Sequence, residues 1–219
     1  MITTGELVKR VRRLLNEAED DAHLSLLSED TRSIDEHILR LLPQAVALVQ
    51  KNKAPGCGNV NPRTVGAASA VIADCGNGTA LLQLPADFAF LVSLQLKGWK
   101  RPCRAMLAPD SSEAVARRNG YVPAGVCRPL CVESVADDGS RAALLSPLPA
   151  GEAPALEHFV YEASFDASEG LMGCNALLAD AVAYYCAALL YSVFEHQTQA
   201  NAFLSLATLL CNGKMGERR

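Results

Sequence analysis

Residues 175–212 read NALLADAVAYYCAALLYSVFEHQTQANAFLSLATLLCN, and this stretch decides the C-terminal part of the fold. No glycine or proline interrupts it, and its polar segment 195–199 predicts either one long helix or two helices joined near Gln197. Asp180 and the tyrosines indicate a helix buried in a protein core rather than a membrane span. The residues that recur at the helical period are Leu178, Val182, Cys186, Leu189, Val193, Phe203, Leu204, Ala207 and Leu210.

The N-terminal segment predicts two further helices. Thr3 or Thr4 can cap an amphipathic helix that begins near Gly5, with apolar residues on one face and basic residues on the other. The helical period returns later and predicts a second helix over 33–50, bent at Pro43. We expect the helices from both ends of the chain to pack together as a bundle.

The middle of the chain follows a different pattern, with turn residues and alternating apolar side chains. The segment Ala54-Pro55-Gly56-Cys57-Gly58-Asn59 predicts a loop. Farther along, Asn77-Gly78 favours the positive φ angles of a tight hairpin between strands at 68–73 and 79–84. The other predicted elements are a strand at 90–96, a short helix at 111–119, and strands at 125–135, 142–145 and 158–165.

These patterns together predict an α+β fold. Residues 1–53 with 170–219 are expected to form the helical bundle, and residues 54–169 are expected to form a β-rich insertion that projects from it. With 219 residues, the chain is long enough to bury a substantial core, so we expect one compact domain overall.

Composition excludes several classes of protein. Half of the residues are hydrophobic, 20% are charged, and the formal net charge is −4. These values are atypical of collagen-like, disordered and strongly basic nucleic-acid-binding proteins. The first residues carry Lys9, Arg10, Arg12 and Arg13 where a signal peptide needs apolar side chains, so we do not expect secretion by that route.

Motifs for catalysis or cofactor binding are missing from the sequence. It contains no G-x-S-x-G, no Walker A lysine, no G-x-G-x-x-G after a strand and no H-E-x-x-H. The eight cysteines form no C-x-x-C pair, and the four histidines lie at no metal-ligand spacing from them, so we expect neither a metal site nor a cofactor. The cysteines are expected to be free thiols that mostly fill the core.

Charge is unevenly distributed over the middle segment. Residues 97–118 hold six basic side chains against two acids, whereas residues 133–169 hold eight acids against Arg141. Such polarity suits head-to-tail contacts between identical subunits, contact with a charged partner, or an ordinary soluble surface. Trp99, the only tryptophan, is either the anchor of a local hydrophobic cluster or an interface residue. The candidate contact residues are Trp99, Lys100, Arg101 and Arg104.

Three stretches carry a family resemblance. They are residues 3–17 (TTGELVKRVRRLLNE), the segment Leu84-Pro85-Ala86-Asp87-Phe88 with the following 91–96 and Trp99-Lys100-Arg101-Pro102, and residues 181–190 (AVAYYCAALL). In this order they resemble the first helix, an LPxDF element after a hairpin, and the C-terminal helix of the head-to-tail connector proteins of tailed bacteriophages. The chain especially resembles the portal adaptor or ring proteins of crAss-like and related short-tailed phages.

The resemblance implies a structural virion protein and no enzyme. Proteins of this family assemble as a closed ring, commonly of twelve copies, below the portal vertex. The expected partners are therefore further copies of this chain, the portal protein, and other connector or tail proteins. Genome DNA would pass through the lumen without specific binding and without a membrane being involved. The expected location is the head-tail junction of a phage or prophage virion, assembled in the cytoplasm of the bacterial host.

Two other functions remain open at this point. The first is a cytoplasmic cysteine-dependent enzyme that uses Cys57 or Cys127 as its nucleophile. The second is a nucleic-acid-binding regulatory domain that uses the basic segment 97–118. Selective alkylation of one thiol would favour the enzyme, and salt-sensitive binding to DNA would favour the regulatory domain.

Overall fold

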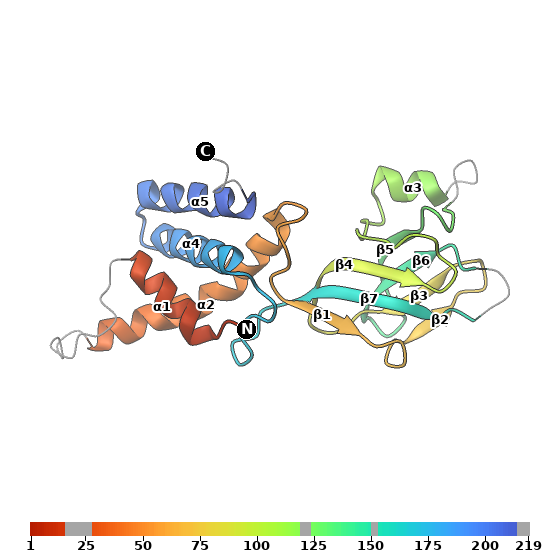
Figure 1. Cartoon of the computed structure of the whole chain (residues 1–219), viewed down its shortest axis with the longest axis horizontal. Coiled ribbons are helices and arrows are strands. Elements are labelled where there is room, and N and C mark those ends of the chain that lie inside the picture. The colour runs from red at the N-terminus through yellow and green to blue at the C-terminus, as the bar shows by residue number, and fades with distance from the viewer. Residues whose placement is uncertain (16–27, 119–123, 150–152, 214–219) are drawn as a thin grey trace. The chain divides into compact units, whose positions relative to one another are not determined.

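The chain divides into two compact units (Figure 1). Residues 1–61 with 164–219 form one, which we call the helical unit, and residues 62–163 form the other, the β unit. Each unit has a hydrophobic core of its own. The computed structural model describes residues 1–15, 28–118, 124–149 and 153–213.

This division corrects the fold class predicted from the sequence. We expected an α+β fold in which a helical bundle carries a β-rich insertion. The structure is instead a mixed α/β chain with helices towards both termini and a β-rich middle that is a compact unit by itself. The physical reason is that the middle segment encloses enough apolar side chains to form a separate core between its own sheets.

The boundaries between the units fall at residues 61/62 and 163/164. Val60 is fully buried in the core of the helical unit. The next residue, Asn61, donates its side-chain amide to the Ser164 carbonyl at 3.2 Å and accepts from the Met172 backbone N–H at 3.2 Å. These bonds hold both connecting segments to the helical unit. Residues 214–219, which the sequence pattern assigns to the bundle, lie outside the described residues.

The helical unit contains α1, α2, α4 and α5. The predicted cap of the first helix is confirmed, since Thr3 accepts a hydrogen bond from the Glu6 backbone at 3.2 Å. The C-terminal stretch forms two helices rather than one, and the chain turns between them at Glu195, which has a φ of 61°. The helices span Thr4–Leu14 (α1), Ser28–Asn52 (α2), Ala176–Val193 (α4) and Gln197–Cys211 (α5).

Helix α4 is the core of the helical unit. It packs against α1, α2 and α5 (Figure 1). Asn175 caps its start by accepting from the Leu178 N–H at 2.8 Å. Within the described chain, α4 is the one helix long and apolar enough to cross a membrane, and 56% of that window is buried inside the protein. Packing against three helices accounts for the apolar residues on its buried faces.

The β unit contains two antiparallel sheets. Strands Pro62–Val65 (β1), Leu156–Ala163 (β7) and Phe88–Leu96 (β4) form a three-stranded sheet in the order β1-β7-β4. The second sheet has the order β2-β3-β6-β5. Its strands are Ile72–Asp74 (β2), Ala80–Gln83 (β3), Leu130–Val135 (β5) and Arg141–Ser146 (β6).

Buried side chains from both sheets meet in one core. Phe159 of β7 and Leu94 of β4 come from the first sheet, and Leu82 of β3 and Leu145 of β6 come from the second. The predicted hairpin is confirmed, because β2 pairs with β3 across the turn at Gly76 and Gly78, both of which have positive φ. A short helix, α3 (Ser112–Arg118), also forms where one was predicted. The first strand, β1, was not predicted.

Candidate functional site

Trp99 lies in the core of the β unit. Its side chain is 3% exposed, and its Nε1 donates to the Pro147 carbonyl at 2.8 Å. Gln95 donates its side-chain amide to the Trp99 carbonyl, also at 2.8 Å. The structure therefore places Trp99 in the first of its two predicted roles, as the anchor of a hydrophobic cluster, and leaves almost none of its surface for a partner.

The other three predicted contact residues lie at the surface of the same unit. Lys100, Arg101 and Arg104 are exposed on the segment that follows β4. Arg101 and Arg104 line a shallow cavity of about 290 Å³ together with Arg128 and Glu113. The structure thus brings a third arginine, distant in sequence, to the predicted basic surface. A cluster of guanidinium groups around a cavity can bind anions or acidic side chains.

The thiols at this basic cavity are poorly suited to nucleophilic catalysis. Cys131 is buried, and burial followed by the nearby Cys103 raises the pKa of its thiol far above the usual value. Cys127 is exposed and lines the cavity, but the cavity-lining residues include no histidine that could act as its base. This environment offers the predicted cysteine-dependent chemistry no support at Cys127.

One pair that sequence reasoning missed is Ser93 with His158. The two residues lie on neighbouring strands, β4 and β7, and the Ser93 Oγ is 2.7 Å from the His158 Nε2. A serine–histidine hydrogen bond supplies two of the three members of a Ser-His-Asp catalytic triad, and the third is a carboxylate that accepts from the histidine. Within the described residues, however, no carboxylate accepts from His158, and neither residue lines the basic cavity of the β unit. The pair is best read as a cross-strand contact.

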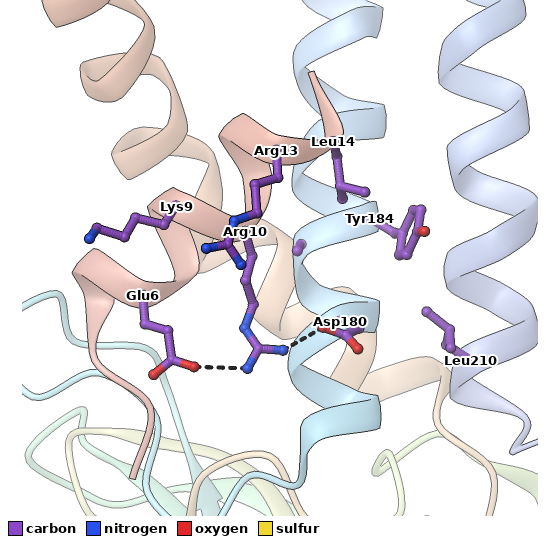
Figure 2. A pocket seen from close by; sticks show the side chains of 9 residues that line it. Glu6, Lys9, Arg10, Arg13, Leu14, Asp180, Tyr184 and Leu210 are labelled. Atoms are coloured by element: carbon purple, nitrogen blue, oxygen red, sulfur yellow. Dashed lines mark hydrogen bonds and ion pairs between the residues drawn. The ribbon is translucent and has the colours of Figure 1, made fainter. Parts of the chain in front are cut away.

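A larger cavity lies in the helical unit, between α1, α4 and α5, with a volume of about 520 Å³. Figure 2 shows Arg10 between the carboxylates of Glu6 and Asp180. The Glu6 contact is 2.8 Å, and it contributes most to raising the pKa of the Arg10 guanidinium above its usual value. Arg10 therefore keeps its charge and ties α1 to α4.

The rest of this cavity combines an apolar wall with a basic rim. Leu14, Tyr184 and Leu210 form the wall, one from each helix, and Lys9 and Arg13 lie on the exposed side of α1 (Figure 2). Nothing in the lining pairs a nucleophile with a base. The arrangement is suited to holding another molecule by packing and charge.

The outward face of α5 is the second feature that sequence reasoning missed. None of the fifteen residues of α5 is charged. Leu204, Leu206 and Leu209 are 45%, 39% and 45% exposed, and Leu206 and Leu209 lie on the same side as Ala202 at helical spacing. We call Ala202, Leu206 and Leu209 the α5 apolar face. The helical period alone placed Leu204 among the core residues, but it is exposed. The signal that could have indicated an exposed apolar surface was the absence of charged residues from this helix.

The segment Leu84–Phe88, which carries part of the family resemblance, has a structural role in the β unit. Asp87 accepts from the Tyr161 hydroxyl at 2.8 Å and pairs with Arg63 at 3.1 Å. Burial, and then the bond to Asp87, raises the pKa of Tyr161 to about 12. Arg141 donates to the Phe88 carbonyl at 3.0 Å and lies over its ring. The motif joins both sheets and needs no ligand to explain it.

Comparisons of the chain with protein-family models and with curated proteins find no match to either.

Proposed function

We propose that this protein is a structural subunit of a head-to-tail connector ring in a tailed phage or prophage. The observation that carries the proposal is the α5 apolar face. A helix without charge that leaves leucines at the surface is typical of a surface that another protein covers. The occupant that we assign to it is a neighbouring copy of the same chain, because a ring is built by repeating one contact between identical subunits.

The division into two units supports the same function. A ring subunit needs a rigid body that packs against its neighbours and a second part that can contact other connector or tail proteins. The helical unit and the β unit have separate cores, so each can form its own contacts. The basic cavity at Arg101, Arg104 and Arg128 would then accept acidic side chains of a partner.

The proposed partners are further copies of this chain, the portal protein and other connector or tail proteins, at the head-tail junction of the virion. Genome DNA passes through a ring of this kind without specific recognition. A net charge of −4 suits that role, because strong positive charge in the lumen would bind the phosphate backbone.

The test is the mass of the purified chain by light scattering, followed by negative-stain imaging, alone and mixed with the portal protein encoded nearest to it. We expect rings, or a portal decorated by this chain. In a second sample, Leu209→Asp places a charge on the α5 apolar face and should weaken assembly by at least about tenfold.

The matched control is Val71→Asp, which introduces the same charge at a residue of the β unit that is 62% exposed. It should assemble as the unaltered chain does. Assembly that survives Leu209→Asp would remove α5 from the interface. A monomer that ignores the portal protein in every sample would contradict the connector function itself.

A further inference from the structure

Two cysteines that are far apart in sequence lie on segments that are hydrogen-bonded to each other at the end of the helical unit. Cys57 lies in the loop after α2, between Gly56 and Gly58, and Cys211 is the last residue of α5. The backbone N–H of Ala54 donates to the Cys211 carbonyl at 2.9 Å, and the Cys57 N–H donates to the Ala54 carbonyl at 3.2 Å. These two bonds hold the loop that carries Cys57 against the end of α5.

The side chains of the two residues belong to the same hydrophobic cluster. Cys211 is fully buried in the core of the helical unit, and Cys57 packs against that core from the loop. The Cys57 Sγ is so close to Gly213 that a Cβ at this glycine would lie 3.3 Å from it. Asn175 fixes the loop from the other side, because its amide donates to the Cys57 carbonyl at 2.9 Å.

We propose that Cys57 and Cys211 form a redox pair, which a small disulfide such as oxidised glutathione converts into a disulfide bond. Both cysteines are free thiols in the structure. The bond would join the loop after α2 to the end of α5, so that the two segments flanking the β unit in sequence are linked covalently. It is a modification of the helical unit and does not depend on the proposed assembly.

The chemistry proceeds in two exchange steps. The Cys57 thiolate attacks one sulfur of oxidised glutathione, which breaks the glutathione S–S bond, releases one glutathione thiolate and leaves a mixed disulfide on Cys57. The Cys211 thiolate then attacks the Cys57 Sγ and expels the second glutathione thiolate. The two protons lost by the protein thiols pass to the two glutathione thiolates, so one disulfide is formed and one is reduced.

Exposure sets the order of these steps. Cys57 is partly exposed and can meet the oxidant, whereas Cys211 is buried and can react only with a neighbour. Burial, followed by the nearby Cys57, raises the pKa of Cys211 to about 11. Since only the thiolate attacks, closure of the mixed disulfide should accelerate about tenfold per pH unit between pH 7 and 9.

The experiment uses the full chain incubated with oxidised glutathione, quenched with acid, and digested with trypsin and a glutamate-specific protease under non-reducing conditions. Cleavage after Lys53 and Arg63 isolates Cys57 in peptide 54–63, and cleavage after Glu195 and Lys214 isolates Cys211 in peptide 196–214. We expect these two peptides to be recovered as one linked species by mass spectrometry. The oxidised chain should also melt about 5–15 °C higher than the reduced chain.

Variants complete the test. Cys57→Ser and Cys211→Ser should each abolish the linked species, and Cys211→Ser should retain glutathione on Cys57. Cys75→Ser is the matched control, because Cys75 is an exposed thiol in the β2–β3 turn, and this variant should form the linked species as the unaltered chain does. A stable glutathione adduct on Cys57 of the unaltered chain, or a link from Cys57 to any other cysteine, would overturn the proposal.

Discussion

The two units of this protein reach similar compactness by different use of the chain. The β unit is one continuous segment, residues 62–163, whereas the helical unit combines both ends of the chain. The core of the β unit is formed by side chains of two sheets. The ring centroids of Phe88, Phe159 and Tyr161 lie within 6.2 Å of one another in this core. The core of the helical unit centres on α4 and is mostly aliphatic, with Tyr185 as its one buried aromatic side chain among the described residues. Because the two cores share no buried side chain, we expect that each can be weakened separately.

The largest effect is expected from Phe159→Ala. This side chain is fully buried and contacts two other aromatic rings, so its truncation should destabilise the β unit by about 3–5 kcal/mol. Hydrogen exchange measured by mass spectrometry should show faster exchange in residues 62–163 and unchanged protection in α4. Equal loss of protection in both units would mean that they unfold as one, and the comparison would fail.

A smaller effect is expected from high pH. The pKa of Tyr161 is raised to about 12 in the folded protein, above the ordinary value of 10. The contribution of neutral Tyr161 to the folded state is therefore complete below pH 10 and is lost as the pH rises towards 12. The ionised side chain would be buried and would also face the Asp87 carboxylate. We expect the β unit to lose roughly 1–2 kcal/mol over this interval, measured by urea unfolding at each pH.

The matched variant is Tyr161→Phe, which removes the titrating hydroxyl and keeps the ring. Its urea midpoint should be lower than that of the unaltered chain at neutral pH and should change less between pH 10 and 12. If the variant loses stability over that interval as steeply as the unaltered chain does, then another group is responsible.

The smallest effect is expected in the helical unit, from Asn175→Ala. The substitution removes the cap of α4 and should cost about 1 kcal/mol of unfolding free energy. Far-UV circular dichroism during thermal unfolding should show the loss, and Gln199→Ala, on the surface of α5, is the control expected to change little. A cost near zero would indicate that packing alone positions the start of α4.

The helices were more accessible to sequence reasoning than the strands. The cap at Thr3 follows from local chemistry, so its position could be predicted closely. The sequence left open whether residues 175–212 form one helix or two, and the structure shows two. Strand β1 could not, because its four residues pair with β7 about a hundred positions later, and no local pattern encodes such a partner. The separate core of the β unit was missed for the same reason: it depends on which sheets face each other.

The candidate site was predictable only in part. Lys100, Arg101 and Arg104, predicted as contact residues, are exposed, and whether they contact a partner stays a prediction. Arg128 reaches the cavity of Arg101 and Arg104 from a segment more than twenty residues later, which the sequence did not indicate. The cavity beside Arg10 depends on Asp180 of α4, which the sequence showed only as an interruption in an apolar stretch. Charges that act in pairs across long separations need the fold before they can be recognised.

The chain enters and leaves the β unit on paired strands. Pro62 of β1 pairs with Glu162 of β7, and just outside these strands Asn61 bonds to Ser164. The β unit therefore begins and ends at neighbouring points. Replacing it with another sequence whose ends are equally close would leave the two flanking segments in their present positions. The β unit can therefore be replaced as one continuous segment, residues 62–163, without cutting the helical unit anywhere else.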